Sequence, residues 1–149
     1  MCGSRRRKGL IYLSNETLHC HGIVKGYGEG EALVSKDAIC FYLADPKTGV
    51  VRERGHCLEG MSVAGKVLVF STGKASSAVQ MDGLRKLMLN NALPAAMIVA
   101  SPELVLVSAA AILKIPLVDK LDRDPFSRIQ TGDFVKVDAT NATVTVTKV

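Results

Sequence analysis

The chain has 149 residues and a mass of 15.9 kDa, which is the size of one domain that can bury a core. Hydrophobic residues make up 48% and charged residues 22%, which excludes a disordered chain and a mini-protein held together by disulfides. The longest apolar stretch, residues 104–113, is about half of the roughly 20 residues that a bilayer requires. The N-terminus shows no apolar signal-peptide run, so we expect a soluble cytoplasmic protein.

The net charge is +5, and Arg5, Arg6, Arg7 and Lys8 supply four of these positive charges. A basic segment of this kind can contact RNA or an acidic membrane surface. Aromatic residues are only 5% and tryptophan is absent, so the chain offers no platform on which bases could stack. We therefore expect residues 1–17 to be a disordered basic tail, with residues 18–149 forming a single domain, and we do not expect nucleic-acid binding.

The four cysteines, Cys2, Cys20, Cys40 and Cys57, are too widely spaced for a CxxC metal or redox motif. Cys20 is followed by His21, and Cys57 is preceded by His56, so each pair could offer soft metal ligands. A free cysteine more often behaves as a small hydrophobic residue. We therefore predict reduced thiols and no metal site on this chain.

The first half of the chain carries strand signals broken by glycines. An apolar run over residues 18–25 is followed by three glycines within residues 26–30, which predict a turn or bulge. Residues 32–34, 38–43 and 50–51 are predicted strands, and residues 45–49 (DPKTG) are a predicted tight turn. The first half is therefore predicted to form an antiparallel β layer.

The second half alternates buried strands with helices. The short apolar runs 66–70, 95–100 and 115–119 have the length of buried strands. Between them, apolar residues recur at helical spacing over 79–88, and Pro102 is expected to open a helix that ends near residue 113. Residues 134–138 and 143–147 alternate as half-exposed strands do.

Strand, helix, strand, helix and strand, framed by β-hairpins at both ends, predict a compact α/β domain of β/β/α type. A doubly wound nucleotide-binding fold is disfavoured, because the β-rich first 60 residues leave few βα units.

The loop over residues 71–77 (STGKASS) is the one segment that indicates chemistry. It joins a predicted strand to a predicted helix, where free backbone N–H groups and a partial positive charge favour an anion. Lys74 adds a full positive charge. A serine at this place can also be a simple helix cap, and the segment is not a Walker A loop. The residues alone name no reaction.

Seven blocks in order resemble the small subunit, or swivel domain, of the aconitase X family. The blocks are residues 28–35, 45–49, 58–70, 73–77, 94–98, 115–119 and 131–139. The resemblance implies a β/β/α swivel fold of the aconitase superfamily that closes over a large catalytic subunit. In that family the large subunit holds an iron–sulfur cluster, so this chain should bind no cofactor itself. Family members dehydrate small hydroxylated acids, including cis-3-hydroxy-L-proline and mevalonate 5-phosphate.

The family loop brings a serine to the substrate, and Ser76 occupies that place here. The resemblance thus implies that Ser76 is the catalytic base, with Gly73, Lys74, Ala75 and Ser77 binding substrate. A serine hydroxyl is a poor base at its free pKa, so N–H groups and Lys74 would have to stabilise the alkoxide. The family's middle glycine is replaced by Ala75.

Two other functions fit the residues. The loop could dock an anion in a binding module whose basic tail contacts RNA, or the chain could be a structural partner without catalysis. We favour the hydro-lyase subunit, and this preference rests on the resemblance.

Overall fold

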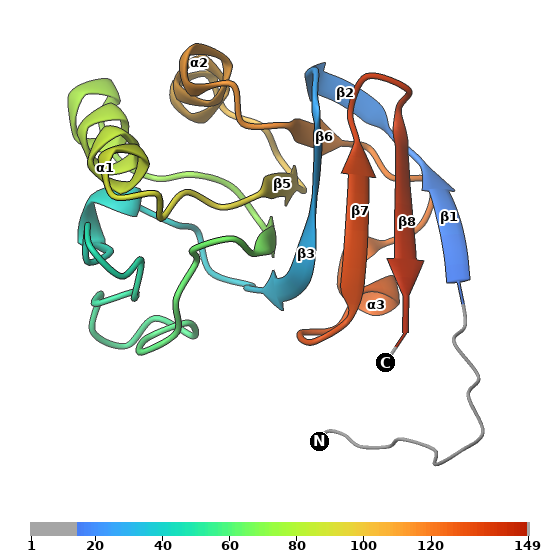
Figure 1. Ribbon diagram of the computed structural model, residues 1–149, viewed down its shortest axis with the longest axis horizontal. Helices are drawn as coiled ribbons and strands as arrows, with labels where there is room; N and C mark the ends of the chain where they lie inside the picture. Colours follow the sequence, from blue (N-terminus) through green and yellow to red (C-terminus); the bar gives the residue numbers. More distant parts are fainter. Residues whose placement is uncertain (1–14, 149) are drawn as a thin grey trace.

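The computed structural model describes residues 15–148, which form eight β-strands, three α-helices and one 3-10 helix (Figure 1). In chain order the elements are β1 (Asn15–His19), β2 (His21–Val24), β3 (Tyr27–Val34), the 3-10 helix η1 (Phe41–Leu43), β4 (Val67–Phe70), α1 (Ser77–Leu89), β5 (Ala96–Val99), α2 (Leu104–Leu113), β6 (Leu117–Asp119), α3 (Pro125–Arg128), β7 (Phe134–Asp138) and β8 (Thr143–Thr147). Of the helices in this range, none combines the length and apolarity that crossing a bilayer requires.

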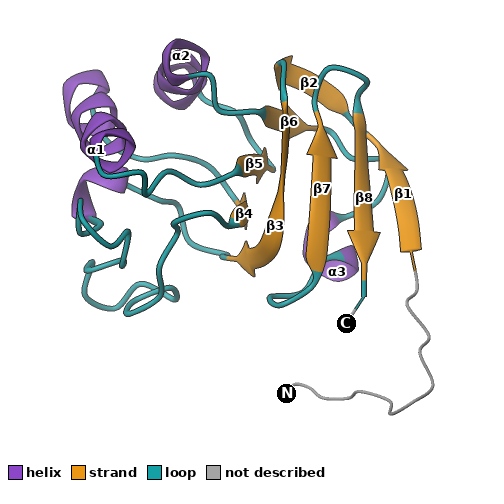
Figure 2. Cartoon of the chain, viewed as in Figure 1, coloured by secondary structure: helices purple, strands orange, loops and turns teal. Residues whose placement is uncertain are grey.

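The strands form one mixed sheet in the order β1-β8-β7-β3-β4-β5-β6-β2. Strands β3, β4, β5 and β6 run parallel, and the remaining neighbours pair antiparallel. The two edge strands, β1 and β2, are separated in the chain by Cys20 alone. The sheet therefore has to curl until its edges meet near this residue, and Figure 2 shows β1 leading directly into β2.

The parallel strands lie at the centre of the core because both of their faces are covered. Every residue of β4, β5 and β6 is buried. On one face, Leu68 and Met97 pack with the helices, and on the other, Val69 and Ile98 pack with the antiparallel strands. Such two-sided burial explains the continuous apolar runs of these strands, and it confirms the three predicted buried strands.

Helices α1 and α2 pack side by side over the same face of the parallel strands (Figure 1). Gly83 in the middle of α1 lies against η1, because a Cβ at this position would come within 2.3 Å of the Tyr42 nitrogen. The glycine that weakens the helix by propensity thus permits close packing. Pro102 precedes α2 rather than opening it, since Glu103 is the N-cap.

Several predictions for the first half are wrong. Gly28 and Gly30 lie inside β3, where a Cβ would come within 2.1 Å and 2.5 Å of the carbonyl oxygens of Ala95 and Gly65. These glycines allow close backbone approach instead of making a turn, and of the three only Gly26 has a positive φ, 139°. Residues 38–43 form an isolated bridge at Ile39 followed by η1, and residues 50–51 form isolated bridges only.

The ends of the chain also differ from expectation. The predicted N-terminal hairpin does not form, because β1 pairs with β8 and β2 pairs with β6. Strand β1 includes residues 15–17, which we had assigned to the tail. The short helix α3 was not predicted. The hairpin of β7 and β8 is confirmed, whereas Arg5–Lys8 and Cys2 lie outside the described residues.

Candidate functional site

The loop of residues 71–77 leaves the carboxyl end of β4 and enters α1. It is attached to the segment after β3 by a parallel bridge between Ile39 and Gly73. The Ile39 N–H donates to the Thr72 carbonyl at 3.0 Å, and the Lys74 N–H donates to the Ile39 carbonyl at 3.1 Å. Backbone hydrogen bonds alone therefore fix the position of the first half of the loop.

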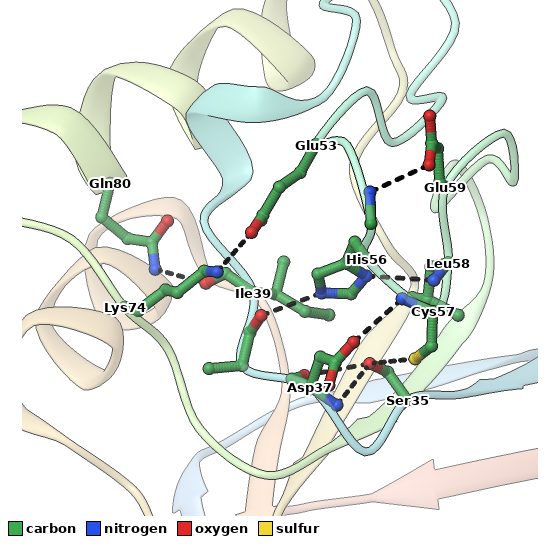
Figure 3. Close-up of polar contacts among 12 residues, drawn as sticks. Ser35, Asp37, Ile39, Glu53, His56, Cys57, Leu58, Glu59, Lys74 and Gln80 are labelled. Atoms are coloured by element: carbon green, nitrogen blue, oxygen red, sulfur yellow. Dashed lines mark hydrogen bonds and ion pairs between the residues drawn. The ribbon is translucent and has the colours of Figure 1, made fainter.

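Gln80 ties the same segment to α1 from inside the protein (Figure 3). Its side chain is completely buried. The Oε1 atom accepts the Phe41 N–H at 2.7 Å, and Nε2 donates to the Ile39 carbonyl at 3.1 Å. Sequence analysis missed this residue, although its position on the apolar face with Leu84 and Leu87 was a signal that it is buried.

Gly73, predicted to bind substrate, is buried. A Cβ here would lie 2.9 Å from Gln80 Nε2 and 2.9 Å from Glu103 Oε1. Glu103 is itself occupied as the N-cap of α2, where it accepts the N–H groups of Val105 and Leu106 at 2.9 and 3.0 Å. The structure thus gives a packing reason for the glycine.

Lys74 is exposed, but its charge is already paired (Figure 3). Its Nζ lies 2.5 Å from Glu53 Oε2, and its backbone N–H is used by Ile39. We expected both groups to support an anion in the loop. In this structure the backbone N–H is taken by Ile39, and the Lys74 side chain connects the loop to the segment that carries Glu53.

Ala75 has a φ of 142°, a backbone conformation that L-residues rarely adopt. The restriction that we noted from the sequence, an alanine in place of a glycine, therefore falls on a position with a positive φ. Residues held in such regions cost about 1–3 kcal/mol each and persist only where the surroundings hold them. The next residue, Ser76, is exposed at the end of this strained turn.

Ser76 is the N-cap of α1, and its Oγ accepts the Val79 N–H at 3.4 Å. Good hydrogen bonds of this kind are 2.7–3.2 Å long, so the cap is weak and the hydroxyl can take another partner. Within residues 15–148, the N–H groups of Ser77 and Ala78 have no hydrogen-bond acceptor. Two free donors at the positive end of a 13-residue helix therefore lie next to the Ser76 hydroxyl.

The three residues Asp37, His56 and Cys57 are the one group in the described part of the chain that could hold a metal ion, with ligand atoms within 4.8 Å of one another. Both ring nitrogens of His56 are engaged, however: Nε2 with the Ala38 carbonyl at 2.9 Å and Nδ1 with the Leu58 N–H at 3.0 Å. Metal binding would have to break one of these bonds.

The contacts of Asp37, His56 and Cys57 are better explained as a hydrogen-bond network that holds the structure together. Asp37 Oδ2 accepts the Cys57 N–H at 2.9 Å, and this bond is the main reason why the pKa of Asp37 lies below its usual value. The Cys57 Sγ lies 3.1 Å from the Ser35 Oγ (Figure 3). Together with the His56 bonds, these contacts fix the loop that presents Glu53 to Lys74.

The other thiol next to a histidine also lacks the features of a ligand. Burial is the main cause that raises the pKa of Cys20 to about 11, and the charge of Asp119 adds to it. The Cys20 thiol is therefore protonated at neutral pH, as expected for a half-buried cysteine that packs as a small hydrophobic residue. The neighbouring His21 Nδ1 is bonded to the buried Asp119 Oδ1 at 2.8 Å.

Comparison with known proteins identifies the family to which the chain belongs. A family model for the aconitase X swivel domain matches residues 17–146. The phosphomevalonate dehydratase small subunit of Methanococcoides burtonii is 45% identical over 85% of this chain and 93% of the relative. That of Methanocella arvoryzae is 46% identical over 80% of this chain and 91% of the relative.

A solved structure gives the same result. The crystal structure of the holo form of Thermococcus kodakaraensis aconitase X superposes with a TM-score of 0.79 at 38% identity, covering 88% of this chain and 98% of that chain. The predicted resemblance and the α/β swivel-type fold are confirmed.

Proposed function

Because the chain belongs to the aconitase X swivel-domain family, we propose that it is the small subunit of a phosphomevalonate dehydratase. The observation that carries this proposal is the similarity to small subunits of that name over at least 80% of the chain. A subunit described as small implies a large partner, which we infer for this chain as well. Of the two substrates considered from the sequence, the relatives favour mevalonate 5-phosphate over cis-3-hydroxy-L-proline.

Dehydration of a 3-hydroxy acid removes a proton from the carbon beside the carboxylate and a hydroxyl group from the next carbon, leaving a double bond and water. We assign the proton to the Ser76 Oγ, which takes it as the alkoxide while the hydroxyl group leaves as hydroxide. Transfer of the proton from the Ser76 hydroxyl to this hydroxide forms the water and restores the alkoxide. Support for this role comes from its exposure, its weak capping bond and the free N–H groups of Ser77 and Ala78. These donors and the helix dipole would stabilise the alkoxide in place of Lys74.

The iron–sulfur cluster of the family does not fit the described residues of this chain. Such clusters are held by several cysteine thiolates at one place. The candidate ligand group with Asp37 and His56 contains a single thiol, Cys57, and Cys20 carries a raised pKa. We therefore place the cluster on the large subunit, and we assign this chain the base and the closure of the site.

The test is to co-express the chain with a phosphomevalonate dehydratase large subunit and to purify the pair by size-exclusion chromatography. We expect one heteromeric species that converts mevalonate 5-phosphate to its dehydrated product. Turnover of cis-3-hydroxy-L-proline serves as the comparison. Elution as two separate species, or an assembled pair that prefers the proline substrate, would contradict the proposal.

A further inference from the structure

A cleft that the loop of residues 71–77 does not line lies outside the carboxyl ends of β5 and β6. Its volume is about 320 Å³, and it is lined by Val99, Ala100 and residues 120–125. In α/β sheets, ligands bind preferentially outside the carboxyl ends of parallel strands. The cleft therefore occupies the edge of the sheet where a ligand is expected.

The cleft shares this edge with the loop that carries Ser76. The Ala100 N–H donates to the Phe70 carbonyl at 3.1 Å, and the Ser101 N–H donates to the Ser71 carbonyl at 2.9 Å. The segments that follow β4 and β5 thus run side by side from the ends of their strands. The segment that follows β5 therefore lines the cleft through Ala100 and borders the start of the Ser76 loop at Ser71.

Two cations of this cleft are available for an anion, whereas the cation of the Ser76 loop is not. Lys74 is paired with Glu53 at 2.5 Å. Lys120 and Arg123 are exposed, and across residues 15–148 neither forms an ion pair within 4.0 Å. A phosphate group that carries up to two negative charges therefore finds unpaired cations at the same edge of the sheet as the loop.

Two carboxylates also line the cleft, and they differ in their surroundings. Asp124 is committed to the protein, because its Oδ1 caps α3 by accepting the Phe126 N–H at 3.1 Å. Asp122 is exposed, and its backbone N–H, not its carboxylate, is bonded to the His19 carbonyl at 2.9 Å. The Asp122 side chain would repel an anion held by Lys120 and Arg123.

We propose that this cleft binds the phosphate group of the substrate through Lys120 and Arg123. The inference rests on the proposed function, in which the substrate is a phosphorylated hydroxy acid. It predicts that the cleft sets substrate affinity and leaves proton removal to the Ser76 loop.

The test uses the assembled complex and the variants Lys120→Gln and Arg123→Gln. Each should raise KM for mevalonate 5-phosphate by about tenfold or more, because a hydrogen bond to a charged group contributes about 1.5–3 kcal/mol. The kcat should stay within about threefold, since the lost contact is present in the ground state and transition state alike. Asp122→Asn should lower KM, an effect that a purely structural role would not produce.

Lys114→Gln is the matched control. Lys114 is an exposed lysine with a φ of 59°, close to the 50° of Lys120, but it follows α2 at the opposite end of β6. We expect it to leave KM unchanged. If Lys120→Gln and Arg123→Gln behave like Lys114→Gln while the wild-type complex is active, the phosphate site is wrong and the proposed function stands.

A measurement without turnover separates the two proposals. Titration calorimetry of the complex with inorganic phosphate should give a binding constant that the double variant of Lys120 and Arg123 weakens by about tenfold or more. A complex that binds phosphate in this way but dehydrates no mevalonate 5-phosphate would overturn the proposed function and keep the anion site. Phosphate binding that is unchanged in the double variant would overturn the site.

Discussion

The buried amide of Gln80 and the backbone carbonyl of Ile39 are joined by a 3.1 Å hydrogen bond that links α1 to the segment after β3. The Ile39 carbonyl also accepts the Lys74 N–H, so one oxygen holds both the loop of residues 71–77 and the helix that follows it. Gln80 further accepts the Phe41 N–H at 2.7 Å. The position of Ser76 between these anchors thus depends on a completely buried side chain, that of Gln80.

Replacing Gln80 by methionine keeps the length of the side chain and removes both hydrogen bonds. The Phe41 N–H would then be buried without an acceptor, which costs about 1–3 kcal/mol. We expect the free energy of unfolding, measured by urea denaturation and circular dichroism, to fall by this amount. Gln130→Met is the control, because Gln130 is exposed and the change should stay within about 0.5 kcal/mol. Equal stability of the two variants would show that the Gln80 hydrogen bonds contribute nothing to the free energy of unfolding.

Ala75→Gly should stabilise the protein. A φ of 142° is strained for alanine and free for glycine, which offsets the larger entropy that glycine has in the unfolded chain. We expect a net gain of about 1 kcal/mol in the free energy of unfolding, with turnover of the complex kept or raised. Ala78→Gly, in the first turn of α1, should have the opposite sign.

A loss of stability in Ala75→Gly would mean that the turn is not strained. A large loss of kcat with intact assembly would show that this loop needs the alanine side chain.

The pKa of Cys20 predicts a specific loss of stability at alkaline pH. The folded thiol ionises near pH 11, whereas the unfolded thiol ionises near 9.0. Between these values the unfolded state has lost the proton that the folded state still binds, so stability falls as pH rises. Cys20→Ala should flatten this part of the curve of unfolding free energy against pH, from 8 to 11.

Cys57→Ala is the comparison for this experiment, because Cys57 is an exposed thiol in the same chain. It should keep the slope of the wild type. If both variants show the wild-type slope, the raised pKa of Cys20 is not the cause of the alkaline destabilisation.

Sequence patterns predicted the centre of the fold because local properties determine it. Buried parallel strands require continuous apolar runs, and β4, β5 and β6 show them. The first half was harder, because the role of Gly28 depends on the Ala95 carbonyl, which lies far away in the chain. A glycine in a turn and a glycine under a crossing backbone have the same sequence signature.

In the candidate site, too, the sequence predicted the local features but not the contacts between residues distant in the chain. Ser76 as the start of a helix follows from the local pattern, and its family role followed from the resemblance. The pairing of Lys74 with Glu53 joins residues 21 positions apart, and Gln80 bonds Phe41 across 39 positions. Contacts of this range depend on how the loops fold back, so the local pattern could not show that Lys74 is paired with Glu53.

The last prediction concerns Ser76, for which a capping role and a catalytic role give different results. As a cap, the hydroxyl contributes little, because the typical value of about 1 kcal/mol applies to shorter bonds than the 3.4 Å seen here. Ser76→Ala should therefore lower the melting temperature of the complex only slightly. As a base, the hydroxyl takes the substrate proton, and its loss should reduce kcat by about 10²–10⁴-fold.

Ser77→Ala is the control on the same turn. Ser77 is exposed, is the first residue of α1, and keeps its backbone N–H in the variant. We expect its kcat to stay within about tenfold of wild type, since a substrate contact is weakened but no proton transfer is lost. Both variants should elute with the large subunit, and Ser76→Ala should keep a KM similar to that of the wild type. A Ser76→Ala complex that turns over within about threefold of wild type would show that the hydroxyl is only a cap, because the loss of a base is far larger.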